Sequence, residues 1–204
     1  MSSRSFLSGA TAIFLREMQI FRLRIVRPTY ALSSLITPLM YLLVFGLGLG
    51  RQVRIDGSDY LSFLIPGLIG MTAMSNAFSW VAGAINFSRF YYRTWALVIL
   101  APVSPFAICA GNITAGLARA LIATSLIALT GLVAGWRPML TPVFPLALLI
   151  EMVCFAALGV LVGVKTKTSE EHMAYANFLI TPMGFFCGTF FPLDNLPIWL
   201  AYPL

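Results

Sequence analysis

Residues 87–105 read FSRFYYRTWALVILAPVSP, and this stretch separates two long hydrophobic segments of the chain. It carries two arginines, five aromatic residues and two prolines. Arginine and aromatic side chains concentrate where a membrane protein meets the aqueous phase, and the prolines end a helix. We therefore predict that residues 87–101 form a cytoplasmic elbow between two membrane-spanning helices.

The composition of the whole chain supports a membrane protein. Of its 204 residues, 59% are hydrophobic and only 10% are charged, whereas soluble domains carry about 25% charged residues. The formal net charge is +6, but the basic residues are scattered between apolar runs and form no patch that would suit nucleic acid. The composition predicts an all-α integral membrane protein, because helices satisfy their own backbone hydrogen bonds in lipid.

The lengths of the apolar runs define the expected spans. A helix needs about 20 apolar residues to cross a bilayer. The segment 94–136 contains one charge and would be about 65 Å long as a single helix, so it must break, and Ala101–Pro105 supplies the turn residues. Five spans are expected, over residues 29–50, 60–82, 106–131, 142–164 and 173–191.

The N-terminal segment has a different pattern. Residues 5–26 carry an apolar stripe at helical spacing, made of Leu7, Ala10, Phe14, Met18, Phe21 and Ile25. Arginines flank the stripe, so we predict an amphipathic helix in the headgroup plane. A helix that packs on a soluble core is the alternative.

The distribution of Lys and Arg predicts the orientation. With the N-terminus in the cytoplasm, nine basic residues lie inside and three outside, which agrees with the positive-inside rule. The inside set is Arg4, Arg16, Arg22, Arg24, Arg27, Arg89, Arg93, Lys165 and Lys167; the outside set is Arg51, Arg54 and Arg137.

Two short patterns concern helix packing and capping. Gly159 and Gly163 lie four residues apart in the fourth predicted span, and this spacing favours the close approach of another helix. Ser169, followed by Glu170 and Glu171, is typical of the start of a helix and is predicted to cap the fifth span.

Two charged residues lie inside predicted spans. We expect Arg119 and Glu151 to form an ion pair between neighbouring helices, because an unpaired charge at that depth is costly. The alternative is that each faces water or another subunit separately. The chain has a single histidine and shows no set of residues typical of a catalytic or metal site, so we expect no catalytic, cofactor or metal-binding residues.

The elbow residues Arg89, Tyr92, Arg93 and Trp95 are candidates for contact with a soluble partner. A role in anchoring the chain to lipid headgroups is the alternative.

Three features together resemble the membrane subunit of type-2 ABC exporters, in the branch that exports lipooligosaccharides, polysaccharides and drugs. They are the amphipathic N-terminal segment, the elbow with Arg93-Thr94-Trp95 and Ala101–Pro105, and the late segment Gly188–Pro197, which reads GTFFPLDNLP.

The resemblance implies a homodimeric permease with six spans per subunit, bound to separate ATPase subunits that hold ATP and Mg²⁺. It also implies that 87–101 is the coupling helix and that 192–204 forms a re-entrant segment at the outer face. The chain ends at Leu204, before any sixth span, so we expect a fragment or a truncated product.

The predicted function is therefore the translocating permease of an ATP-driven exporter in the bacterial inner membrane, moving an amphiphilic substrate outward. Phe178, Phe185 and Phe186 are expected to line the pathway. The alternatives are a membrane-embedded enzyme that modifies lipid, with Arg119 and Glu151 at its centre, and a carrier that does not use ATP.

Overall fold

The structure, a computed structural model, describes residues 3–25, 36, 40, 43–44, 54–55, 58–133, 135–136 and 141–186. The predicted span over 29–50 lies almost entirely outside the described residues, and the predicted re-entrant segment over 192–204 lies wholly outside them.

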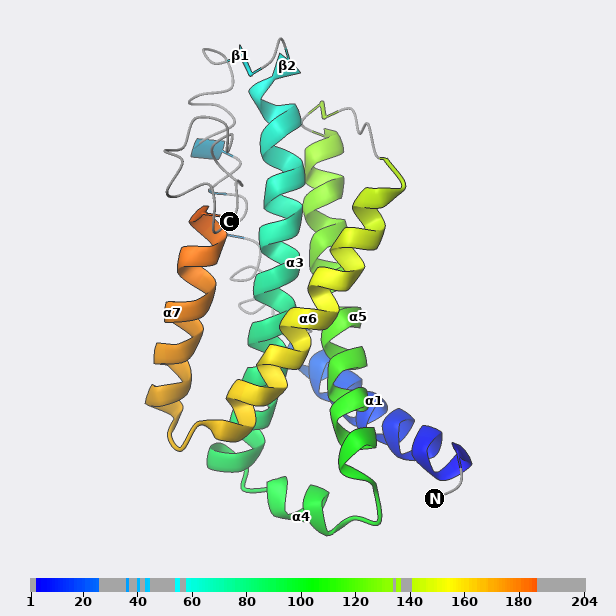
Figure 1. The fold of residues 1–204 in the computed structure, drawn as a ribbon. Coiled ribbons are helices and arrows are strands. Elements are labelled where there is room, and N and C mark those ends of the chain that lie inside the picture. Colours follow the sequence, from blue (N-terminus) through cyan, green and yellow to red (C-terminus); the bar gives the residue numbers. More distant parts are fainter. Residues whose placement is uncertain are drawn as a thin grey trace.

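The described chain is built of helices. The α-helices are α1 (Ser3–Ile25), α3 (Tyr60–Asn86), α4 (Trp95–Leu100), α5 (Pro105–Val133), α6 (Val143–Lys165) and α7 (Ser169–Phe186). A π-helical turn, η2 (Phe87–Tyr91), continues α3. Two residues each of β1 (Arg54–Ile55) and β2 (Ser58–Asp59) pair antiparallel. This confirms the all-α fold class, with a short hairpin at one end of the molecule (Figure 1).

Among the described residues, three helices are long and apolar enough to cross a membrane: Phe63–Tyr91, Pro105–Val133 and Val143–Lys165. They coincide with three of the predicted spans, but the first runs further than the predicted end near residue 82. No proline interrupts α3 after Pro66, and the hydroxyl of Ser88 donates to the carbonyl of Ala84 at 2.6 Å. Without a breaking residue, the helix continues into the elbow.

Helix α3 is the centre of the packing. It makes its most extensive contacts with α6 and α5, which lie side by side against it (Figure 1). The largest side chains that are fully buried come mainly from α3 and include Phe78, Leu64, Ile65, Leu68 and Ile85. The outward faces of α5 and α6 are apolar and exposed, as expected for helices that face lipid.

Close contact between α6 and α3 depends on glycine. A Cβ on Gly159 would lie 2.7 Å from the backbone oxygen of Phe78, and a Cβ on Gly163 would lie 3.0 Å from the Cβ of Ile85. The predicted close approach at these two glycines is confirmed. Their missing side chains allow the two backbones to touch.

Helix α1 packs against α5 with a face that is rotated from the predicted apolar stripe and shares Phe21 with it. Among the side chains of α1 that the structure describes, the buried ones are Gly9, Ile13, Glu17 and Phe21, which recur every four positions. Leu7, at the start of the predicted apolar stripe, is exposed. The buried face contains a glutamate, which a pattern based on hydrophobicity excludes, and only its partner on α5 explains why it can be buried.

Helix α7 begins at Ser169, the residue predicted to be its cap, and the cap lies one residue earlier, at Thr168. The Thr168 hydroxyl accepts a hydrogen bond from the Glu171 amide at 3.1 Å, while the Glu171 carboxylate accepts one from the Lys167 amide at 2.7 Å. This reciprocal arrangement resembles a capping box, so Thr168 is the cap and the prediction of Ser169 was wrong. Ser169 instead contacts Asn86 of α3, with its hydroxyl 3.0 Å from the Asn86 Oδ1.

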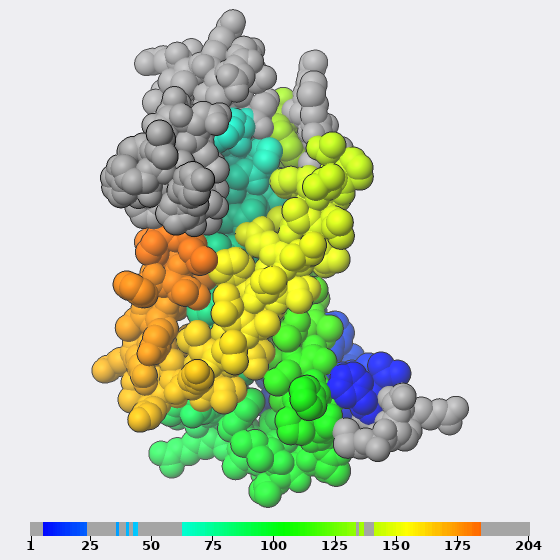
Figure 2. All heavy atoms as spheres, in the orientation of Figure 1, coloured from blue at the N-terminus to red at the C-terminus, as the bar shows by residue number. Residues whose placement is uncertain are grey.

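The connections sort to the two ends of the bundle. The elbow with α4, the α6–α7 connection and the N-terminal end of α1 lie at one end, and the hairpin lies at the other (Figure 1). Helix α7 forms a separate column beside α6 (Figure 2). The segments that carry the predicted cytoplasmic charges Arg89, Arg93, Lys165 and Lys167 are thereby gathered at one end.

Candidate functional site

The elbow is a π-helical turn, a sharp bend and a short helix. After η2, Arg93 adopts a left-handed backbone conformation with φ of 52°, and the Thr94 carbonyl accepts hydrogen bonds from the amides of Leu97 and Val98 at 3.1 and 3.3 Å. Non-glycine residues rarely adopt positive φ, so the bend at Arg93 is a local strain that neighbouring contacts must hold. Pro105 then starts α5, and Ser104 accepts from the Ala107 amide at 3.2 Å.

The elbow exposes bulky side chains around this bend. Tyr92 is 55% exposed, Leu97 68% and Leu100 80%, and Tyr91 and Ile99 are also exposed. Arg93 is exposed beside them. Apolar surface of this kind at the end of a bundle needs a cover, either lipid or protein. Leu97 and Leu100 fall inside the predicted elbow, but their exposure was not predicted, because an apolar residue in a sequence does not show whether it is buried.

Arg89 has a different role from Arg93. Its Nη1 lies 2.8 Å from the carbonyl oxygen of Gly163, 2.6 Å from that of Val164 and 2.9 Å from that of Thr166. It therefore donates to the unpaired carbonyls at the C-terminal end of α6, where a cation is favoured by the helix dipole. Arg89 fastens the elbow to the α6–α7 connection.

Trp95 also faces the molecule. It packs against the buried cluster formed by α3, α5 and α6, which includes Val81, Ile85 and Val160. Of the four elbow residues singled out in the sequence, Tyr92 and Arg93 are therefore exposed on the surface, while Arg89 and Trp95 attach the elbow to the bundle.

The predicted ion pair between Arg119 and Glu151 is not formed, and Arg119 is paired with Glu17 of α1 instead. The Arg119 Nη2 lies 3.5 Å from the Glu17 Oε2, and it also donates to the Glu17 backbone carbonyl. Arg119 and Glu17 are 4% and 3% exposed. The Arg119 guanidinium lies 5.1 Å from the ring centroid of Phe21 and 5.0 Å from that of Trp80, a geometry that favours a cation.

Glu151 lies elsewhere in the bundle. Its Oε2 is 3.7 Å from the position that a Cβ on Gly70 would occupy, so the side chain faces the middle of α3. The predicted pair joined the two charges that lie inside spans, whereas the partner of Arg119 comes from the amphipathic helix α1. A catalytic centre made of Arg119 and Glu151 would need both groups in one place, and the structure does not bring them together.

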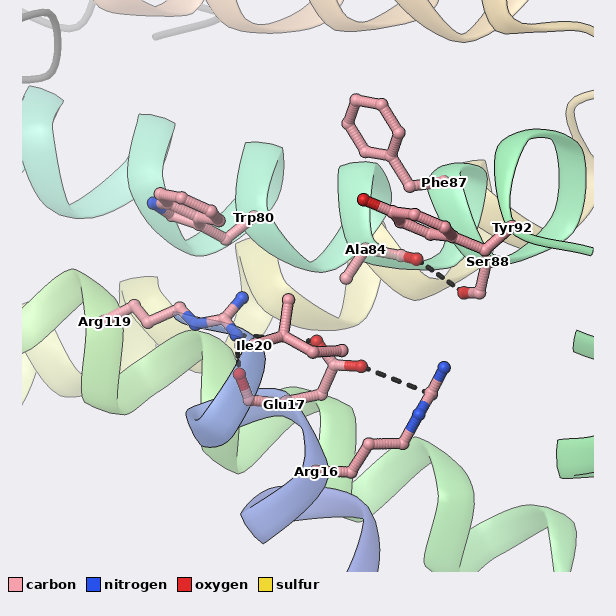
Figure 3. A pocket seen from close by; sticks show the side chains of 9 residues that line it. All are labelled: Arg16, Glu17, Ile20, Trp80, Ala84, Phe87, Ser88, Tyr92 and Arg119. Carbon is pink, nitrogen blue, oxygen red and sulfur yellow. Dashed lines mark hydrogen bonds and ion pairs between the residues drawn. The ribbon is translucent and has the colours of Figure 1, made fainter. Parts of the chain in front are cut away.

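Arg16 completes a junction between α1 and the elbow. Its Nη1 lies 3.4 Å from the Glu17 Oε1, and its Nη2 lies 3.3 Å from the Thr94 Oγ1. Arg16, Glu17 and Arg119 border a small cavity of about 20 Å³, which is lined also by Ile20, Trp80, Ala84, Phe87, Ser88 and Tyr92 (Figure 3). That volume is large enough for about one water molecule. The cavity is therefore too small for a substrate and is a packing feature where α1, α3, α5 and the elbow meet.

The remaining predicted site residues lie on α7. Phe178 is 81% exposed, whereas the side chains of Phe185 and Phe186 lie outside the described residues. Within the described ranges, no group of three or more His, Cys, Asp or Glu side chains is placed to hold a metal ion.

Comparisons with known proteins agree on a family. A family model described as ABC-2 type transporter matches residues 10–202. Inner membrane transport permease YadH of Escherichia coli strain K12 is 32% identical over 164 residues, which cover 79% of this chain and 64% of the relative.

Nodulation protein J of Rhizobium leguminosarum bv. viciae is 32% identical over 171 residues, covering 82% of this chain and 65% of the relative. Nodulation protein J of Rhizobium meliloti strain 1021 is 30% identical over 169 residues, covering 81% and 64%. The chain spans less than two thirds of the length of these curated relatives.

Proposed function

The chain belongs to the ABC-2 type transporter family, and from this premise we propose that it is the translocating permease of an ATP-driven exporter in the bacterial inner membrane. The family match over residues 10–202 is the observation that carries the proposal. One of the relatives is named an inner membrane transport permease. In this proposal ATP and Mg²⁺ are bound and used by a separate ABC ATPase, and this chain catalyses no reaction.

The elbow is the proposed docking surface for that ATPase. Tyr92, Arg93 and the exposed leucines Leu97 and Leu100 provide aromatic, cationic and apolar contacts of the kind that anchor protein interfaces. The elbow shares its end of the bundle with Lys165 and Lys167, as expected for a cytoplasmic face. Arg89 and Trp95 support this surface from behind.

The contacts of the elbow suggest how a partner's movement reaches the membrane. Arg89 ties the elbow to the end of α6, and Trp95 ties it to the core between α3, α5 and α6. If ATP closes a pair of ATPase subunits, the elbow moves with them and the attached helices tilt. Access to the pathway then changes by a population shift between two arrangements of the bundle.

The substrate pathway is proposed to lie between two copies of the chain. Helix α7 stands beside the bundle and exposes Tyr175 and Phe178, and aromatic side chains of this kind suit either a second copy or an amphiphilic substrate. Phe178, Phe185 and Phe186 are the proposed lining residues. The proposed cargo is amphiphilic, such as a lipooligosaccharide, a polysaccharide precursor or a drug, and it moves outward.

Co-purification tests this function. The chain is expressed with the ABC ATPase encoded next to it and extracted in mild detergent. We expect a stable complex with ATPase activity, and we expect Tyr92→Ala and Arg93→Glu to weaken the association. Arg22→Glu is the matched control, because Arg22 is exposed on α1 and not in the elbow. Absence of a complex in every mild detergent, or equal losses in Arg93→Glu and Arg22→Glu, would contradict the proposal.

A further inference from the structure

Arg16 and Glu17 are consecutive residues of α1, and Figure 3 shows Glu17 between Arg119 on one side and Arg16 on the other. Glu17 is paired with Arg119 of α5 at 3.5 Å, and Arg16 reaches the Thr94 hydroxyl at 3.3 Å. The two are also joined to each other at 3.4 Å. A continuous line of polar contacts therefore runs from the interior of α5, through α1, to the residue that precedes α4.

The inner end of this line is fixed by burial. Glu17 and Arg119 are both excluded from solvent, and Phe21 and Trp80 pack edge to face with their ring centroids 5.7 Å apart beside the guanidinium. Separating the pair would leave two unpaired charges in a buried site, which is strongly unfavourable. Rotation of α1 about its own axis would carry the Glu17 carboxylate away from Arg119 and break the pair. The pair therefore fixes the rotation of α1.

Fixing the rotation of α1 also fixes Arg16. Arg16 is only partly buried, so its own contact with Thr94 is too weak to hold a helix in place. The position of the Arg16 guanidinium depends on where the backbone of α1 lies. The buried pair fixes that backbone at Glu17, the next residue. The bend that Arg16 approaches is the strained one, with Arg93 at positive φ immediately before Thr94.

We propose that Glu17 and Arg119 are positioning residues for the elbow, and that they act through α1 and Arg16. Helix α1 then braces the elbow against α5, in addition to its predicted position in the headgroup plane. The inference rests on the proposed function for its role in transport, because the elbow is the proposed docking surface. The effect of the Glu17–Arg119 pair on the conformation of the elbow is a property of this chain alone, and it is tested without a partner.

The rate of tryptic cleavage after Arg93 measures how often the elbow opens locally. Arg93 is exposed, and the bond to be cut leads directly to Thr94. In the purified full chain in detergent, we expect Arg119→Gln and Glu17→Gln to speed cleavage after Arg93 about tenfold, because local opening becomes easier. Arg22→Gln, on the exposed side of α1, is the matched control and is expected to leave the rate unchanged.

A second measurement follows α1 itself. Ile13 is buried on α1, and its side chain lies against Gly111 of α5. In a background with all native cysteines replaced, an Ile13→Cys thiol is expected to be protected from maleimide and to become reactive when Arg119→Gln is added. Thr94→Val is expected to speed cleavage after Arg93 while the Ile13→Cys thiol stays protected. This substitution removes only the contact between Arg16 and Thr94 and leaves the Glu17–Arg119 pair intact.

A second cleavage site and a conservative variant distinguish a local change in the elbow from unfolding of the whole protein. Cleavage after Lys167, in the α6–α7 connection, is expected to stay constant in all variants. Arg119→Lys keeps the charge and is expected to retain most of the protection at Arg93.

The proposal is overturned if cleavage after Arg93 does not change, or if it rises by the same factor as cleavage after Lys167. Failure to find an ATPase complex would leave these rates unaffected, so the two proposals can fail separately.

Discussion

The guanidinium of Arg89 lies 2.8 Å from the carbonyl oxygen of Gly163, a residue 74 positions further along the chain. One side chain thus joins the first part of the elbow to the last turn of α6. This contact turns a connection between two spans into an element that is attached to a third.

Replacement of Arg89 tests that attachment. Arg89→Ala removes the Nη1 group, whose two N–H bonds are shared among three carbonyl oxygens at the end of α6. A hydrogen bond from a charged group contributes about 1.5–3 kcal/mol. We expect a clear decrease in the melting temperature in detergent. Arg93→Ala, which removes an exposed arginine from the same elbow, is the control and is expected to have little effect. Equal decreases in both variants would contradict the assigned role of Arg89.

The glycines of α6 give a prediction about packing. In Gly159→Ala the new Cβ would lie 2.7 Å from the Phe78 carbonyl oxygen, so α6 must move away from α3. We expect a loss of about 1–3 kcal/mol, as for other overpacked sites, measured by thermal or denaturant unfolding.

Gly83 offers a matched comparison for that substitution. A Cβ on Gly83 meets nothing within 4 Å, so Gly83→Ala is expected to be neutral or to stabilise α3 by about 0.5–1 kcal/mol through helix propensity. A loss in Gly83→Ala as large as that in Gly159→Ala would show that close packing is not the cause.

A double-mutant cycle distinguishes the two possible partners of Arg119. Breaking a buried pair by neutralising one member costs about 3–5 kcal/mol. After Arg119→Gln, the further change Glu17→Gln is therefore expected to cost much less than it does alone. Glu151→Gln is expected to add to Arg119→Gln without coupling, because the two residues lie in different contacts. Coupling with Glu151 and additivity with Glu17 would reverse the assignment.

Thiol labelling in intact cells tests the orientation. Leu97→Cys on α4 and Thr141→Cys before α6 both occupy exposed positions, near opposite ends of the bundle. In a cysteine-free background, an impermeant maleimide is expected to label position 141 from outside and to reach position 97 only after the cells are opened. Labelling of position 97 in intact cells would invert the proposed topology and remove the elbow from the reach of a cytoplasmic ATPase.

Part of the candidate site was predictable from the sequence, because it depends on where the chain must break. The proline-containing turn at Ala101–Pro105 and the arginines on both sides of Tyr91 placed the elbow between two spans. Which elbow residues face outward was not predictable. Arg89 and Arg93 each have one aromatic neighbour in the sequence, Phe90 and Tyr92, and only the nearby end of α6 distinguishes their roles.

The sequence by itself determined the membrane class and the approximate extent of α3, α5 and α6, because the lengths of apolar runs are fixed by the thickness of the bilayer. It also indicated the close approach at Gly159 and Gly163, since a missing side chain is visible in any sequence. The tertiary structure alone decided that Glu17 is buried, that it is paired with Arg119, and that α1 turns a different face to α5. The physical reason is that a charge is buried only where another segment supplies its partner. Which segment does so depends on the packing of the helices, and the sequence does not show it.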